Sequence, residues 1–194
     1  MVVVEDKGLA DLRAILALHG YDAVPARAEM YDLFAANLRA SDKYEASRTP
    51  FEDWRVGLRA ALAAPGAYCV QASGGRAAAL FGVSPHCTEV AQIWMVATDP
   101  FMPEAFARFG PRAAIKMTYV TRAVVSLYRK RHPTVFNVIP DRQTQTIRWL
   151  RQAGFEFFRH PSLVTDMLFF AQGPKGRALS QDTNLWLSSV GRSL

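Results

Sequence analysis

The 194-residue sequence predicts one α/β domain in which helices flank a mixed central sheet. Half of the residues are hydrophobic and 21% are charged, which is a globular composition. The length fits a single domain, and a chain of this size buries roughly 70% of the surface that it exposes when unfolded. Segments with the periodicity of strands and of helices alternate along the chain, which is typical of the α/β class.

The clearest local pattern is the stretch 134–158, which predicts strand, helix and strand. Val135–Ile139 is rich in β-branched and aromatic residues, as strands are. Asp141 follows the proline that ends this strand, and it is predicted to cap a helix that runs to about Gln152. Gly154 suits the left-handed position just past a helix end, so the next strand begins at once.

Four further helices are predicted from apolar residues that recur every three to four positions. These residues are Leu9, Leu12, Ile15 and Leu16 within 1–20; Tyr31, Leu33, Phe34 and Leu38 within Ala28–Leu38; Phe51, Trp54, Leu58 and Leu62 within Pro50–Ala63; and Met117, Val120, Val124 and Leu127 within Pro111–Arg131. Pro111 suits the first turn of the longest helix, and the basic residues 129–131 complement its negative C-terminal end.

The other strands are predicted from short apolar runs between turn residues. They span Tyr21–Val24, Ala67–Ala72, Arg76–Val83, Val90–Thr98, Phe155–Phe158 and Leu163–Ala171. The run Ala77–Phe81 is wholly apolar, which is typical of a central strand covered on both faces. Ser73–Gly75 predicts a hairpin turn. Pro85–His86 predicts a loop, and Asp99–Gly110 a loop with a short helical piece.

The net charge of +6 indicates a basic surface, which favours nucleic acid, acidic cofactors or acidic protein partners. The two cysteines and four histidines have no metal-ligand spacing, so we predict no metal site. No apolar run reaches membrane-spanning length, and the first residues lack the pattern of a signal peptide. We therefore expect a protein that folds in the cytosol, with no membrane segment.

The unit 134–158 resembles the C-terminal half of the GNAT superfamily of N-acetyltransferases, in which a short helix ending in Gly-Phe joins two strands. More narrowly, it resembles the GNAT-like internal virion protein A family of short-tailed phages. The residues that carry the match are Phe136-Asn137-Val138, Asp141, Ile147-Arg148-Trp149-Leu150-Arg151 and Gly154-Phe155-Glu156-Phe157. The order of the predicted elements extends the resemblance over about residues 21–171. It implies an N-terminal helical extension (1–20), a GNAT-like domain (21–171) and a C-terminal tail (172–194).

The stretch Leu38–Glu45 resembles a Leu-Arg-x-x-Asp-x-x-Glu pattern of the phage family. Arg39, Asp42 and Glu45 are therefore candidates for a functional role. The alternative is a cluster of solvated charges that pair with one another.

The GNAT resemblance also implies an acetyl-CoA site, whose motif Gln/Arg-x-x-Gly-x-Gly/Ala holds the pyrophosphate at the start of the long helix. The matching stretch Ala107–Ala113 is degraded in both registers. Counted from Arg108, the first glycine position holds Pro111, which has no N–H. Counted from Ala107, the last small position holds Arg112. If any site remains, its residues are Val96, Ala97, Thr98, Arg108, Gly110 and Arg112.

The catalytic groups that the resemblance implies are missing as well. Leu150 stands where active members commonly have the tyrosine that reprotonates the CoA thiolate, and Gln143 replaces the asparagine that often opens the same helix. The strand Val90–Thr98 has no carboxylate to act as a general base. The nearest one, Glu89, lies at the edge of the strand. His86 is the other nearby base, and its alternative role is that of an ordinary surface residue. We predict no catalytic residue.

The resemblance to the phage family implies a phage virion protein, internal or needed for assembly, and the missing groups imply a degenerate acetyltransferase-like fold. Such a protein acts through contacts with other virion proteins, needs no cofactor, and is located in the virion after assembly in the host cytoplasm. The alternative is an active acetyl-CoA-dependent N-acetyltransferase that acts on an unknown amine. A second alternative is a DNA-associated protein inside the capsid. Apolar residues in the tail, Leu185, Trp186, Leu187 and Val190, predict a segment that docks on a partner; the alternative is a disordered tail.

Overall fold

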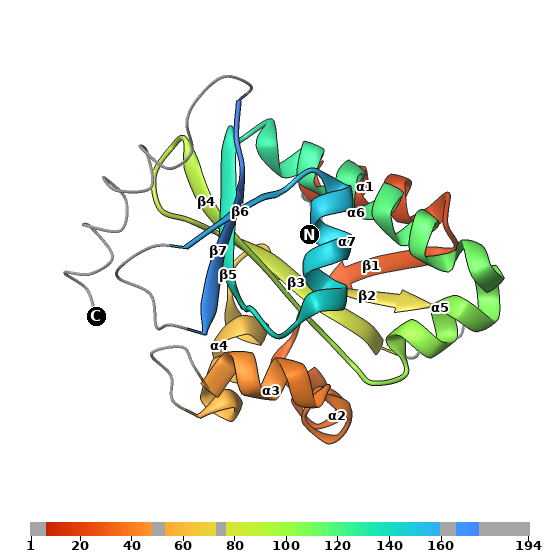
Figure 1. The fold of residues 1–194 in the computed structure, drawn as a ribbon. Helices are drawn as coiled ribbons and strands as arrows, with labels where there is room; N and C mark the ends of the chain where they lie inside the picture. Colours follow the sequence, from red (N-terminus) through yellow and green to blue (C-terminus); the bar gives the residue numbers. More distant parts are fainter. Residues whose placement is uncertain (1–6, 48–52, 73–76, 160–165, 175–194) are drawn as a thin grey trace, which may run out of the picture.

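The computed structural model describes residues 7–47, 53–72, 77–159 and 166–174. In these parts of the chain, seven strands form one sheet in the order β1-β2-β3-β4-β5-β7-β6 (Figure 1). The strands are β1 (Tyr21–Pro25), β2 (Tyr68–Ala72), β3 (Ala77–Pro85), β4 (Val90–Ala97), β5 (Thr134–Pro140), β6 (Glu156–Phe158) and β7 (Met167–Gln172). Neighbouring strands are antiparallel except β4 and β5, which are parallel. The mixed sheet that the sequence predicts is confirmed.

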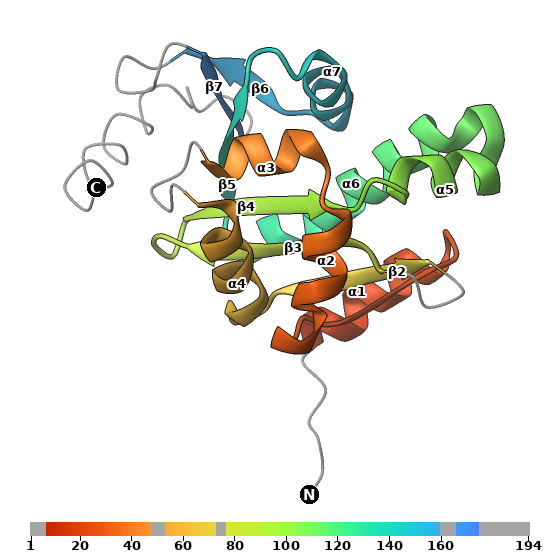
Figure 2. The ribbon, with the colours of Figure 1, turned by 90° about the horizontal axis from the view of Figure 1, so that it is seen from below.

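Helices cover both faces of this sheet (Figures 1 and 2). They are α1 (Lys7–Ala17), α2 (Tyr31–Asn37), α3 (Ala40–Ser47), α4 (Trp54–Ala63), α5 (Phe101–Phe109), α6 (Ala113–Arg129) and α7 (Thr144–Ala153), with 3-10 turns η1 (Ala28–Met30) and η2 (Gly110–Arg112). Helices α1, α5, α6 and α7 lie on one face, and α2, α3 and α4 on the other. None of the helices in the described ranges is long and apolar enough to cross a membrane.

The larger core lies between the sheet and helices α1, α6 and α7. Helix α1 contributes Leu9, Leu12 and Leu16 to it, each at most 5% exposed. The N-terminal helix therefore covers the sheet, beside β1 and α6. The smaller core on the opposite face joins Phe34 of α2 and Leu58 of α4 to the sheet. A central sheet buried on both faces needs both cores.

Two helical segments differ from the sequence prediction. Helix α3 was not predicted, because its apolar residues are few and its one buried side chain, Asp42, is charged. Helix α5 replaces most of the predicted loop 99–110, because Phe101 packs into the larger core and Ala105, one turn further along, is fully buried. The predicted helix Ala28–Leu38 begins with the 3-10 turn η1 and ends at Asn37.

The prediction that Asp141 caps the short helix is wrong. Helix α7 begins at Thr144, and its N-cap position is held by Gln143, which makes no side-chain cap bond. The Asp141 carboxylate instead pairs with Arg159, Nη2 to Oδ2 2.7 Å, and the strand before it extends through Pro140. The other end is as predicted, because Gly154 is left-handed with φ 101° and the Phe155 N–H donates to the Leu150 carbonyl at 3.0 Å.

Two boundaries at prolines also differ. Strand β3 runs to Pro85, which the sequence places in a loop, because the ladder with β4 continues to the pair Pro85 and Ala91. The long helix starts at Ala113, since Pro111 lies in the 3-10 turn before it. The predicted hairpin turn 73–75, residues 160–165 and the tail from 175 lie outside the described residues, and Gln172 closes β7.

Candidate functional site

The sheet opens between β4 and β5. The two strands pair from Val90 with Thr134 to Gln92 with Phe136 and then separate. At the last paired position the Gln92 Nε2 donates to the Asn137 Oδ1 at 3.0 Å, which joins the strands where they part. A cavity of about 150 Å³ lies beyond this point, between the sheet, α6 and α7. Most of its wall is apolar, with Phe81, Ile93, Met95, Val124 and Ile139 among the lining residues.

The segment that joins α2 to α3 occupies the free edge of β4 at the far end of this opening. The Arg39 N–H donates to the Ala97 carbonyl at 3.2 Å, and the Asp99 N–H donates to the Asn37 carbonyl at 2.8 Å. Leu38 and Thr98 form an antiparallel bridge between these two bonds. A short extra strand contact therefore replaces β5 along the end of β4.

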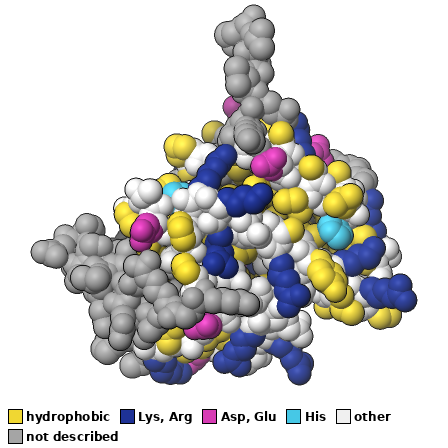
Figure 3. Space-filling model, turned by 90° about the horizontal axis from the view of Figure 1, so that it is seen from above, with side chains coloured by type: hydrophobic (Ala, Val, Ile, Leu, Met, Phe, Trp, Pro, Cys, Tyr) yellow, Lys and Arg dark blue, Asp and Glu magenta, His cyan; other side chains and the backbone are white. Residues whose placement is uncertain are grey.

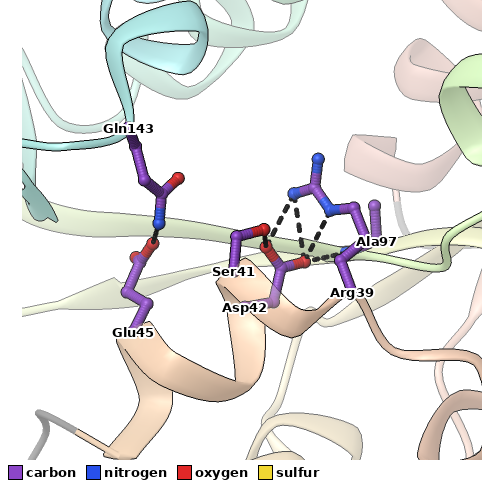
Figure 4. Close-up of polar contacts among 6 residues, drawn as sticks. All are labelled: Arg39, Ser41, Asp42, Glu45, Ala97 and Gln143. Carbon is purple, nitrogen blue, oxygen red and sulfur yellow. Dashed lines mark hydrogen bonds and ion pairs between the residues drawn. The ribbon is translucent and has the colours of Figure 1, made fainter.

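The Asp42 carboxylate completes this contact, as Figure 4 shows. Its Oδ2 accepts a hydrogen bond of 2.7 Å from the Ala97 N–H and one of 3.1 Å from the Arg39 Nε. Its Oδ1 accepts bonds from the Arg39 Nη2 at 2.8 Å and the Ser41 hydroxyl at 3.2 Å. Asp42 is only 4% exposed, so the interpretation of residues 39–45 as a solvated charge cluster is wrong for this residue. A buried carboxylate needs such donors, because unpaired burial of a charge is costly.

Glu45 lies one turn further along α3 and lines the cavity. Its Oε2 accepts a hydrogen bond from the Gln143 Nε2 at 3.3 Å, which links α3 to the start of α7 (Figure 4). Burial, with the nearby charge of Asp42 as the second cause, raises the pKa of Glu45 to about 8. Glu45 is thus a carboxyl that is mostly protonated at neutral pH.

One polar atom of the cavity wall has no partner in the described structure. The Trp149 Nε1, on α7, is buried and donates no hydrogen bond within the described residues. Trp149 is partly buried at the cavity wall and packs against the larger core. The sequence pattern predicts the helix, but it cannot predict whether the Trp149 N–H has a hydrogen-bond acceptor.

Two of the residues predicted to hold acetyl-CoA, Ala97 and Arg108, make hydrogen bonds within the chain. Ala97, between Val96 and Thr98, has its N–H and carbonyl occupied by Asp42 and Arg39. The Arg108 Nη1 donates to the Gly20 carbonyl at 2.6 Å, on the side of β1.

The start of α6 is equally poor in free donors. The Ala113 N–H donates to the Gly110 carbonyl within the 3-10 turn, and Pro111 has no N–H. Gly110 itself has φ 57°, and Arg112 is exposed. Helix starts bind phosphate through free backbone N–H groups. Here Pro111 lacks an N–H, and the Ala113 N–H is already bonded to the Gly110 carbonyl.

The residues considered for catalysis lie in two different places in the structure. Leu150 is buried and lines the cavity at the position where a general acid is expected. Glu89 and His86 are exposed at the opposite end of β4 from Ala97, and neither lines the cavity. Although His86 is exposed by its surface area, partial desolvation of its ring beside Phe136 lowers its pKa, and a hydrogen bond with Gln92 opposes that shift. Within the described ranges no group of three or more His, Cys, Asp or Glu side chains is placed to hold a metal ion.

Comparison with solved structures identifies the fold. A GNAT-family acetyltransferase from Bacillus anthracis matches with a TM-score of 0.53 and 12% identity, over 78% of this chain and 93% of that chain. Spermidine N-acetyltransferase from Vibrio cholerae, solved with CoA and spermine, matches with a TM-score of 0.52 and 6% identity, over 79% and 95%. Ard1 from Thermoplasma volcanium matches with a TM-score of 0.52 and 13% identity, over 79% of this chain and 97% of that chain. The chain has the GNAT fold.

At these identities the likeness concerns the fold alone. Protein-family models give no match to the chain, and neither do curated protein sequences. The overall arrangement of helices and strands is thus shared with GNAT acetyltransferases. The contents of the opening must be judged from this chain's own residues.

Proposed function

We propose that this protein is a non-catalytic GNAT-fold protein that acts through protein–protein contacts as an internal or assembly protein of a phage virion. The observation that carries the non-catalytic part is the Asp42 carboxylate on the Ala97 N–H. The virion part is supported by the sequence resemblance around Phe136–Val138 and Leu38–Glu45. Its location is then the virion, after assembly in the host cytoplasm.

Physical chemistry explains why Asp42 opposes a ligand on β4. A thioester that lies along Val96–Thr98 needs the Ala97 N–H, so it has to displace a carboxylate that Arg39 also holds. Leaving a buried polar group without a partner costs about 1–3 kcal/mol, and more for a charge. The degraded phosphate motif at Gly110 and Pro111 supplies little to offset that cost.

Calorimetry with acetyl-CoA and CoA tests the non-catalytic part, with the Vibrio cholerae spermidine N-acetyltransferase as the positive control. We expect no binding by this protein. Binding in the low micromolar range, about −8 kcal/mol, contradicts the proposal. Mass spectrometry of purified particles of the phage that encodes the chain tests the virion part. The chain's absence from particles and from their assembly intermediates contradicts it.

A second candidate is an acetyl-CoA-dependent N-acetyltransferase. It is favoured by the cavity that remains between β4 and β5, and by Glu45, a protonatable carboxyl in its wall. The same calorimetry separates the two candidates. Acetyl-CoA binding that improves in the variant Asp42→Ala favours the enzyme with a self-blocked site.

DNA association is the remaining alternative. The Lys and Arg side chains on the face drawn in Figure 3 are spread among hydrophobic ones and do not line one groove. Salt-dependent binding to a DNA duplex is the observation that favours this function.

A further inference from the structure

Positive charge is concentrated in the segment that contains α6 and α7. Residues 105–155 hold ten Lys and Arg residues and one carboxylate, Asp141. That carboxylate is paired with Arg159. Helices α6 and α7 themselves contain no acidic residue. The rest of the chain has 13 basic and 16 acidic residues by the same count, so the asymmetry belongs to this part of the molecule.

The solvent-facing side of α6 carries two large apolar side chains, Ile115 and Tyr119. Ile115 and Tyr119 are each 57% exposed and lie one turn apart. Arg112 and Arg122 continue the same line at both ends and are exposed as well. The opposite side of the helix is buried in the larger core through Met117, Val120 and Val125. A surface helix usually presents polar residues to solvent, so apolar residues on both sides indicate a second contact surface.

Two contacts define the borders of this line of residues. On one side Lys116 places its Nζ 4.4 Å from the centre of the Phe109 ring of α5, and Phe106 of α5 is 47% exposed. On the other side the Arg122 Nε donates to the Gln152 carbonyl at the end of α7 at 3.1 Å. Exposed basic residues of α7 continue the surface there; they are Arg148 and Arg151. Basic side chains therefore surround a small apolar centre.

We infer that this α6 stripe (Arg112, Ile115, Lys116, Tyr119 and Arg122) is a docking surface for an acidic amphipathic helix of a partner protein. An apolar face of such a helix packs on Ile115 and Tyr119, and its carboxylates face Arg112, Lys116 and Arg122. Tyrosine at the centre of an interface commonly carries much of the affinity. The inference rests on the proposed function in that it takes the partner to be a protein.

The charge alone would also suit a phosphate backbone. Nucleic-acid contacts that ignore sequence need cations and not an exposed aliphatic side chain on a helix. Ile115 lies between the basic residues, and a charged phosphate backbone offers no apolar surface for its side chain to pack on. The apolar centre therefore favours an acidic protein segment over DNA.

Fluorescence anisotropy with a synthetic peptide tests the inference. The probe has leucines on one helical face and glutamates on the others; its controls are a scrambled peptide of the same composition and a DNA duplex. We expect Tyr119→Ala and Ile115→Ala each to weaken binding of the probe about tenfold. Leu18→Ala is the matched control, because Leu18 is 83% exposed at the end of α1 and its loss leaves binding unchanged. Circular dichroism melts verify that all three variants fold as the wild type does.

The inference is overturned if Tyr119→Ala and Ile115→Ala bind the probe like the wild type, or if the scrambled peptide binds equally well. It is also overturned if the duplex binds more tightly than the probe and Tyr119→Ala leaves duplex binding unchanged, which indicates a nucleic-acid surface. These outcomes do not depend on CoA binding or on the presence of the chain in particles. Failure of the stripe and failure of the proposed function are therefore distinguishable.

Discussion

At the scale of single residues, Asp42 has the most consequential contacts beside the opening between β4 and β5. Its carboxylate bonds to the backbone of β4 and to the Arg39 guanidinium, so one side chain fixes α3 to the sheet. The sequence pattern singles out Arg39, Asp42 and Glu45, and the structure brings all three to the same cavity. Burial of Asp42 was not predictable, because the residues around it in the sequence are mostly charged or polar.

Arg39 is the residue to change in a test of this arrangement. Arg39→Ala leaves the buried Asp42 carboxylate without its charged partner, and we expect a loss of about 3 kcal/mol in the free energy of unfolding. Arg39→Lys keeps the charge but not the two-pronged bond, so its loss is smaller. Urea unfolding measures both variants. A loss below about 0.5 kcal/mol for Arg39→Ala is typical of exposed ion pairs and contradicts the role given to Asp42.

At the scale of elements, the prediction succeeded where burial follows an apolar pattern. Helix α7 ends as the sequence indicates, because glycine tolerates the left-handed backbone conformation that Gly154 adopts before Phe155. Its start was misplaced, because Asp141 makes an ion pair with Arg159, far along the chain, instead of a local cap. Helix α1 was predicted as an addition, and the packing of its buried leucines against β1 and α6 required knowledge of the tertiary structure.

The contact between α3 and α7 makes stability depend on pH through Glu45. Its pKa is raised to about 8 in the folded protein, so the folded state retains a proton that the unfolded state releases. The contribution of Glu45 to stability is therefore fully present below the ordinary pKa of a glutamate, falls as the pH rises toward about 8, and levels off above that value. We expect Glu45→Gln to remove this fall and to gain on the wild type as the pH rises. Glu29→Gln, at an exposed position, is the control and keeps the wild-type profile.

Thermal melts at several pH values measure this dependence. Wild-type and Glu45→Gln curves that remain parallel between the two pKa values would show that Glu45 titrates as an exposed carboxylate. The α3–α7 contact would then lack the buried character described above.

At the scale of the whole molecule, the proposed function concerns two regions, the opening between β4 and β5 and the surface of α6 and α7. At the opening between β4 and β5, Asp42 of α3 occupies the Ala97 N–H beside the cavity, and the basic surface of α6 and α7 is the proposed site for a partner. The fold class follows from the order of elements in the sequence. The surface does not, because exposure of Ile115 and Tyr119 depends on how α6 is rotated against the sheet.

The C-terminal tail is predicted to contact a partner and to be dispensable for folding. The Gly173 carbonyl still belongs to the domain, since the Arg129 Nη2 donates to it at 2.8 Å, so the deletion that tests the tail removes residues 175–194. Leu185, Trp186, Leu187 and Val190 are too few to form a core of their own, and repeated copies in a particle add avidity to weak terminal contacts. We expect the shortened chain to melt within a few degrees of the full chain and to enter particles less efficiently in a complementation assay. Normal incorporation removes the docking role of the tail, whereas failure of the shortened chain to fold shows that residues 175–194 belong to the domain.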